Sequence, residues 1–176
     1  MSIYTKKGDR GKTSTIDKKP VSKESALIEA IGAIDELNTY LGLAMTFCQN
    51  RSISELLINT QKDLFRVGSI LAGSKLSFPP SKVRKLENKI DELDSNLKPL
   101  SNFILVGGTR CSAHLQYSRS LARRAERQVV NYAAEKKLNP QVLKYLNRLS
   151  DFLFTLARWD NHQNGVAEEP WVGRRK

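Results

Sequence analysis

Apolar residues recur at intervals of three and four along most of this sequence, and this spacing predicts a helical fold. Side chains three or four residues apart share one face of a helix, whereas a half-buried strand needs strict alternation. The first three series are Leu27, Ile31, Ile34, Leu41 and Met45; Leu56, Leu57, Thr60, Leu64, Val67 and Leu71; and Val83, Leu86, Ile90, Leu93 and Leu97. The last two are Leu115, Ser118, Ala122, Ala125 and Val129, and Val142, Leu146, Leu149, Leu153 and Leu156. The sequence therefore predicts five amphipathic helices and no convincing pair of strands.

Turn-forming residues separate the predicted helices. Ser81 follows Phe78-Pro79-Pro80 and is a plausible N-cap, and Pro99 ends the helix that Ser81 begins. The fourth helix is expected over about 109–137 and the fifth over about 140–164, with Pro140 in a favourable first position. Short connections favour antiparallel neighbours, so we predict an all-α, five-helix antiparallel bundle.

The length of 176 residues and a hydrophobic content of 40% suit one domain spanning residues 1–176. Residues 1–24 lack periodicity and are expected to form an ordered N-terminal loop or a tail, ahead of a bundle over residues 25–164 and a C-terminal tail over residues 165–176. No run approaches the ~20 apolar residues that a membrane span needs, and no apolar signal segment is visible. We therefore expect a cytoplasmic protein without a membrane partner.

The formal net charge of +11 favours an anionic partner, which would be nucleic acid, an anionic membrane or a polyphosphate. A solvated basic surface explains the charge equally well until the charges are placed. Neither Cys48 nor Cys111 belongs to a Cys-x-x-Cys pair, and neither His114 nor His162 lies in a cluster of metal ligands, so no zinc site or Cys–His nucleophile pair is indicated. We expect both cysteines to be reduced thiols in a reducing compartment.

Residues 5–14, T-K-K-G-D-R-G-K-T-S, combine glycines, hydroxyl groups and lysines, which suits the binding of a polyphosphate. Gly11-Lys12-Thr13 matches the end of a P-loop, but Lys6 stands where the first glycine is needed and no apolar strand precedes it, so we reject a P-loop. Asp9 could help hold a hydrated magnesium ion. From composition alone, a basic disordered tail is slightly favoured over a binding loop.

Arg119, Arg123 and Arg127 are spaced by four residues and therefore rise along one strip of the fourth predicted helix. Small residues beside the strip would bring the helix close to its neighbour. Like charges at this spacing repel by about a few tenths of a kcal/mol per pair, and a bound phosphate would reverse that sign. The alternative is a solvated basic face tied to acidic side chains, among which Asp35 is the expected partner of Arg119.

Asn147, Arg148 and Asp151 interrupt the apolar series of the last helix. Asn147 and Asp151 are four residues apart and share a face, so they either bond across helices or meet a ligand. The sequence offers no carboxylate pair, Ser-His-Asp set or metal cluster for acid–base or nucleophilic catalysis. An enzyme made of these parts would bind and position a polyphosphate, and the attacking atom would come from elsewhere.

Five blocks occur in order: T-K-K-G-D-R-G-K-T, G-A-I-D-E-L-N-T-Y-L-G, F-I-L-V-G-G-T, R-S-L-A-R-R-A-E-R and Y-L-N-R-L-S-D-F-L-F-T-L-A-R. Together they resemble the PduO-type ATP:cob(I)alamin adenosyltransferases from about Ile3 to Arg158. The resemblance implies a five-helix bundle that forms a homotrimer with active sites between subunits. It implies ATP and Mg²⁺ as cofactors, with Glu126 as the one candidate metal ligand, and a reduced corrinoid as the second substrate.

The resemblance also implies roles for individual residues. The ATP site would be made by Thr5, Lys6, Lys7, Gly8, Thr13, Ser14 and Lys23 of one chain and completed by Arg123, Arg124, Ala125, Glu126, Arg127 and Asn147. Catalysis would rest on Arg123, Phe103, Arg119 and Asp35. Arg119 with Asp35 resembles the family's interface ion pair, and Phe103 matches the aromatic residue that displaces the lower axial ligand of the corrinoid.

The implied reaction is attack of cob(I)alamin on the 5′ carbon of ATP, which releases triphosphate and forms adenosylcobalamin. A cobalt reductase and an adenosylcobalamin-dependent enzyme are the expected transient partners, and nucleic acid is not expected to bind. Val106 stands where the family usually has proline, and Arg110 and Tyr117 replace smaller or neutral residues. These departures leave one alternative function, a non-catalytic trimer that binds ATP or corrinoid as a carrier or sensor.

Overall fold

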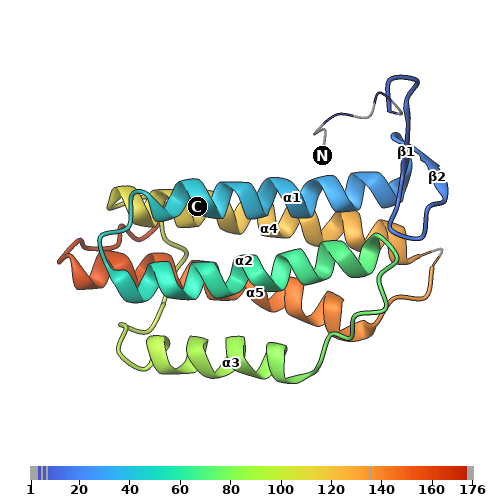
Figure 1. Cartoon of the computed structure of the whole chain (residues 1–176). Helices are drawn as coiled ribbons and strands as arrows, with labels where there is room; N and C mark the ends of the chain where they lie inside the picture. Colours follow the sequence, from blue (N-terminus) through green and yellow to red (C-terminus); the bar gives the residue numbers. More distant parts are fainter. Residues whose placement is uncertain (1–3, 5, 7, 135, 174–176) are drawn as a thin grey trace.

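The computed structural model describes residues 4, 6, 8–134 and 136–173, which form five helices and one short hairpin (Figure 1). The helices are α1 (Ala26–Met45), α2 (Arg51–Leu71), α3 (Ser81–Asp94), α4 (Arg110–Ala133) and α5 (Pro140–Gln163). The strands are β1 (Lys12–Ser14) and β2 (Pro20–Ser22). The predicted five-helix bundle is confirmed.

Helices that follow one another in the chain run in opposite directions, as the short connections predict (Figure 1). α4 packs against both α1 and α5, α2 packs against α1, and α3 covers the outer side of α5. None of the described helices is long and apolar enough to cross a membrane.

The core lies where the apolar series predicts it. Ser118, Ala122 and Ala125 of α4 are fully buried, and their small size lets α4 approach its neighbours closely. The largest fully buried side chains are Tyr145, Phe78, Phe152, Leu37, Leu41, Ile53, Leu57, Leu64, Leu115, Leu146, Leu149 and Leu153. Burial of these side chains contributes most of the stability of the bundle.

Three helix ends lie at other residues than the sequence predicts. Ser81 is the first residue of α3 and not its N-cap, because Pro80 already has helical dihedral angles and takes the cap position without a side-chain hydrogen bond. α3 ends at Asp94, before Leu97, and α4 ends at Ala133, before Lys137. The last residues of both predicted helices therefore lie outside regular structure.

The expectation of no strand pair was wrong. β1 and β2 form an antiparallel hairpin in which Thr13 lies opposite Val21. Its turn is held by the Thr15 hydroxyl, which donates to Asp17 at 2.5 Å, and by a positive φ of 61° at Lys18. Strands of three residues are too short to show alternation, so the sequence carries no strand signal here.

The expectation of two reduced thiols was also wrong, because Cys48 and Cys111 form a disulfide. Their Cα atoms are 4.7 Å apart, although the residues are separated by 63 positions in the sequence. The bond joins the chain just after α1 to the first turn of α4. The packing of α1 against α4 creates this proximity, which cysteine spacing alone cannot reveal.

Candidate active site

The arginine strip, defined as Arg119, Arg123 and Arg127, lies along α4. Arg119 is half-buried and its Nε donates to Gln116 Oε1 at 3.0 Å, whereas Arg123 and Arg127 are exposed. Among the described residues, no carboxylate forms an ion pair with the strip. Burial, and then the positive charge of Arg123, lower the pKa of Arg119. The strip therefore holds concentrated positive charge that a bound anion would stabilise.

Arg124, the fourth arginine of this block, has a different environment. It forms an ion pair with Glu36 of α1, so its charge is already balanced within the chain. The family resemblance predicts that Arg124 binds ATP. Its contact with Glu36 couples α4 to α1 instead of leaving the guanidinium free.

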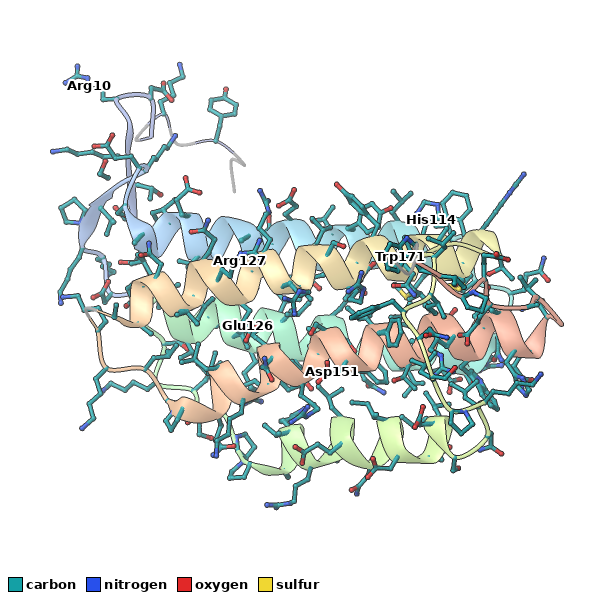
Figure 2. The ribbon with its side chains drawn as sticks, turned by 180° about the vertical axis from the view of Figure 1, so that it is seen from behind. Arg10, His114, Glu126, Arg127, Asp151 and Trp171 are labelled. Carbon is teal, nitrogen blue, oxygen red and sulfur yellow. A yellow bond between two sulfur atoms is a disulfide. The ribbon has the colours of Figure 1, made fainter. Side chains whose placement is uncertain are left out.

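Glu126 and Asn147 meet between α4 and α5, as their joint assignment to one site requires. Asn147 Nδ2 donates to Glu126 Oε1 at 2.9 Å, and Figure 2 shows Glu126 and Arg127 on α4 facing the side of the molecule that also carries Asp151. Asp151 does not bond to Asn147. It accepts from Arg148 Nη1 at 2.7 Å, so only Asn147 of that pair belongs to this cluster.

The described part of the chain contains no group of three His, Cys, Asp or Glu side chains that could hold a metal ion. Glu126 is thus a single carboxylate beside the arginine strip. It can supply one ligand to a cation that also binds phosphate oxygens, which is the usual environment of Mg²⁺ in nucleotide sites.

The N-terminal segment brings Lys23 next to Gly8. Lys23 Nζ lies 3.3 Å from the position that a Cβ atom on Gly8 would occupy, and the backbone N–H of Lys23 donates to Gly11 O at 2.9 Å. Gly11 has a φ of +74°, which favours glycine. Thr13 and Ser14 lie on β1 of the same hairpin, so its glycines, hydroxyls and ammonium group are close together.

Not every predicted ATP-site residue of the N-terminal segment can be placed. Lys6 is exposed, with its ammonium group 5.9 Å from the Tyr4 ring centroid, and Thr5 and Lys7 lie outside the described residues. The hairpin stands off the end of the bundle, and Arg10 lies far from the helices (Figure 2). Within one chain, the described hairpin residues make no hydrogen bond or ion pair with the arginine strip.

Asp35 is exposed on α1 and forms no ion pair with Arg119 within the described chain. The Arg119–Asp35 pair was expected at an interface between subunits. It therefore stays a prediction about the assembly.

Phe103 lies in the segment between α3 and α4, and its side chain is 84% exposed. The C-terminal segment pairs with this loop: Trp171 N donates to Phe103 O at 2.7 Å and Leu105 N donates to Glu169 O at 2.8 Å. A cavity of about 560 Å³ lies beside the paired segments, bounded mainly by residues 97–102 and 165–168. The expectation that the C-terminal residues form only a tail missed this pairing.

The last turns of α5 hold the other end of the Phe103 loop. Asn161 Nδ2 donates to Gly107 O at 3.0 Å, and Asn161 Oδ1 accepts from Thr109 N at 3.0 Å. The Thr109 hydroxyl also donates to the buried carboxylate of Asp160. Sequence reasoning missed both polar residues, although they follow the apolar series of α5 at positions that face the core. Val106 is exposed in the same loop.

A family model for cobalamin adenosyltransferase matches residues 3–160. The chain belongs to the cobalamin adenosyltransferase family. Its similarity to the corrinoid adenosyltransferase of Bacillus subtilis is 35% identity over 96% of this chain and 91% of the relative. The corrinoid adenosyltransferase PduO of Citrobacter freundii is 36% identical over 96% of this chain, which spans only 53% of that protein.

Solved structures show that the similarity extends to the fold. A variant PduO-type ATP:corrinoid adenosyltransferase from Lactobacillus reuteri, complexed with cobalamin and ATP, is 32% identical and superposes with a TM-score of 0.95. The match covers 98% of this chain and 100% of the other. The adenosyltransferase fold is therefore present over the whole described bundle.

Proposed function

We propose that this protein transfers the 5′-deoxyadenosyl group of ATP to the cobalt of cob(I)alamin or a related reduced corrinoid. Triphosphate is released and adenosylcobalamin is formed. The observation that carries the proposal within this family is the unneutralised arginine strip on α4, which lies next to the Glu126–Asn147 pair.

The transfer requires stabilisation of a departing polyanion. The reduced cobalt of the substrate supplies an electron pair to C5′, a cobalt–carbon bond forms, and the C5′–O5′ bond breaks with its electrons moving to the triphosphate. Arg123 and Arg127 donate hydrogen bonds to the phosphate oxygens, and their charge stabilises the leaving group as negative charge develops. No protein base is needed, because no proton is transferred.

The N-terminal hairpin supplies the second half of the phosphate site. Lys23 places its ammonium group beside Gly8. Asn147 and Glu126 orient each other, and Glu126 offers a carboxylate to a magnesium ion that enters with the nucleotide. Magnesium supplies further neutralisation of the triphosphate when bound.

Phe103 serves the corrinoid side of the reaction. Its exposed ring projects from a loop that is held at both ends, so the ring can displace the lower axial ligand of the corrinoid. Loss of that ligand makes cobalt easier to reduce, because no axial donor raises the energy of its acceptor orbital. The loop therefore acts on the attacking cobalt, while the arginines of α4 stabilise the departing triphosphate.

We further propose that the active protein is a homotrimer whose sites form between subunits. Two features of the single chain support this assembly. The described hairpin residues do not bond to the arginine strip of their own chain, and the α1–α4 face carries the exposed apolar side chains Leu43, Phe47 and Tyr117. Arg119 and Asp35 would pair across the interface, and the Asp35 carboxylate would offset the burial and the positive charge of Arg123 that lower the Arg119 pKa.

We also assign the protein to the cytoplasm, where ATP is available, with a cobalt reductase and an adenosylcobalamin-dependent enzyme as transient partners. The Cys48–Cys111 disulfide is the observation that opposes this location, because cytosolic proteins rarely keep disulfides. Cell fractionation followed by immunoblotting tests the assignment. Recovery of the protein with a cytosolic marker supports it, and recovery with a marker of another compartment refutes it.

An anaerobic assay with reduced cobalamin, ATP and magnesium tests the activity. We expect Arg123→Ala to lower the rate of adenosylcobalamin formation by about 10²–10³-fold, the usual effect of removing one electrostatic stabiliser of a transition state. Circular dichroism should show an unchanged helix content, because Arg123 is exposed.

The matched control is Arg84→Ala, which removes one exposed arginine from α3 on the opposite side of α5 and should keep activity within about twofold. Equal activity in both variants would remove the proposed role of Arg123. A wild-type protein that binds both substrates without forming a cobalt–carbon bond would support the carrier alternative that Val106 suggests.

A further inference from the structure

Arg158 is a buried arginine of α5 that lies outside the proposed triphosphate site. Its exposed fraction is 3%, so its charge must be balanced by the protein. Nε donates to Glu168 Oε1 at 2.7 Å and Nη2 donates to Glu168 Oε2 at 3.1 Å, which is a bidentate pair. Nη1 donates to Asp94 Oδ1 at 3.3 Å and Nη2 also donates to Lys98 O at 2.6 Å.

These bonds connect three segments that are distant in the sequence. Asp94 is the last residue of α3, Lys98 begins the loop that leads to Phe103, and Glu168 belongs to the C-terminal segment. Arg158 itself is fixed by α5. One guanidinium group therefore sets the position of both chain segments that border the cavity of about 560 Å³.

The C-terminal segment passes this constraint to Phe103. Residues 169 and 171 on one side are joined by backbone hydrogen bonds to residues 105 and 103 on the other, and Ile104 and Pro170 form an isolated β-bridge. Glu168 directly precedes these paired residues. Its bidentate bond to Arg158 thus fixes the register in which the C-terminal segment lies on the Phe103 loop.

Other contacts do not replace this link. The Glu168 side chain is largely buried, whereas the Asp94 side chain is mostly exposed. The neighbouring Glu169 is exposed, and among the described residues its side chain makes no ion pair. The buried Arg158–Glu168 pair is therefore the main polar anchor of the segment.

We propose that Arg158 is a positioning residue for the corrinoid half of the reaction, acting through Glu168 and the C-terminal segment on the loop that carries Phe103. The proposal rests on the proposed function, because it assigns Phe103 to the corrinoid. It makes the C-terminal segment a working part of the site.

The test compares Glu168→Gln with the adjacent control Glu169→Gln. Glutamine keeps the shape of the side chain but cannot balance the buried guanidinium. In Glu168→Gln we expect the corrinoid KM to rise about tenfold, since a charge-assisted bidentate pair is lost, and the ATP KM to stay within about twofold. Glu169→Gln should leave both KM values unchanged.

Hydrogen exchange supplies a readout that needs no activity. The amides of Leu105 and Trp171 donate the two bonds between the loop and the C-terminal segment. In ligand-free Glu168→Gln, peptides containing these amides should exchange at least about tenfold faster, while peptides from the middle of α4 should keep wild-type rates. Asp94→Asn is a second control, because Asp94 bonds to Arg158 but does not belong to the C-terminal segment. This variant should leave the two amides protected, which separates a positioning role from an effect on general stability.

The outcomes distinguish the two proposals. A wild-type protein that forms no adenosylcobalamin would overturn the proposed function, whatever the exchange data show. An active wild type in which Glu168→Gln keeps a normal corrinoid KM and normal exchange at both amides would overturn the positioning role. Faster exchange throughout the bundle, equal in Glu168→Gln and Asp94→Asn, would also overturn it, because Arg158 would then act only on stability.

Discussion

Gly108 and Asn161 provide a test of how the Phe103 loop is held. A Cβ atom added to Gly108 would overlap Asn161 Oδ1 and would lie 2.6 Å from Asn161 Cγ, which is well inside van der Waals contact. Asn161 cannot simply move, because its side chain is buried and bonds to Gly107 O and Thr109 N. Gly108→Ala must therefore displace the side chain that fixes the loop to α5.

The expected cost follows from these contacts. Displacement of Asn161 breaks two buried hydrogen bonds, each worth about 1 kcal/mol. Alanine at a φ of +107° adds about 1 kcal/mol of backbone strain. We therefore expect Gly108→Ala to lower the free energy of unfolding by roughly 3 kcal/mol.

The assay is urea denaturation followed by circular dichroism at equilibrium. Gly165→Ala is the matched control, because Gly165 also has a positive φ, of +68°, but no atom lies within 4 Å of its added Cβ. The control should cost only about 1 kcal/mol. The difference between the two variants then measures the clash with Asn161.

A double-mutant cycle refutes or supports this reasoning directly. Asn161→Ala alone should cost about 2 kcal/mol, and it removes the side chain with which the methyl group added by Gly108→Ala would collide. The double variant should therefore cost roughly 3 kcal/mol, about 2 kcal/mol less than the sum of the single effects. Additivity within about 0.5 kcal/mol would show that Asn161 does not hold the loop in the manner described.

Two further changes test other contacts by the same denaturation assay. Tyr145→Phe should leave the free energy of unfolding unchanged or raise it by up to about 1 kcal/mol, because its buried hydroxyl has no hydrogen-bond partner among the described residues. Burial, followed by the charge of Asp63, raises the pKa of this hydroxyl. A loss above about 2 kcal/mol would reveal a partner for the hydroxyl. Cys48→Ser should lower the free energy of unfolding by about 3–4 kcal/mol, since it opens a loop between residues separated by 63 positions; an effect equal to that of reducing the wild type with dithiothreitol is expected, and no effect of either treatment would contradict it.

The fold could be predicted from the sequence because burial in a helical bundle repeats every three to four residues. Leu37, Leu41 and Leu64 illustrate this, because all three are fully buried. Leu41 and Leu64 belong to the predicted apolar series, and Leu37 lies between two members of the first series. The prolines at 79–80, 99 and 140 placed the breaks around the third helix and before the fifth within a few residues. The error at Ser81 arose because a proline can begin a helical turn as well as precede one.

The hairpin and the disulfide could not be predicted in this way. Strands of three residues give no period, and a turn such as that at Lys18 depends on a positive φ that lysine rarely adopts. Cys48 and Cys111 meet only because α1 packs on α4. Both features result from tertiary contacts, which leave no local pattern.

The candidate site, too, could be predicted from the sequence only in part. The strip of Arg119, Arg123 and Arg127 was visible because one helix carries all three residues at one spacing, and the structure places them together without a balancing carboxylate among the described residues. The contacts of Arg158 and Asn161 were not visible, because their partners come from the end of α3, the α3–α4 segment and the C-terminal segment. The available signal was that these polar residues lie on the face of the predicted helix that should be buried. Such a residue can bond to a neighbouring loop as well as to a ligand, so the signal does not identify its partner.

The corrinoid side and the phosphate side of the proposed reaction lie at different positions along α4. Thr109 caps the start of α4, and Arg123 lies fourteen residues later, which at ~1.5 Å per residue is a distance of roughly 20 Å. A change at the loop anchors can therefore alter the corrinoid side while the arginines on the rigid helix keep their positions. Gly108→Ala protein that stays folded at low temperature should bind ATP with wild-type affinity and bind the corrinoid more weakly. Parallel loss of both affinities would mean that the loop and the arginine strip are coupled through α4, and that the separation argued from the structure is wrong.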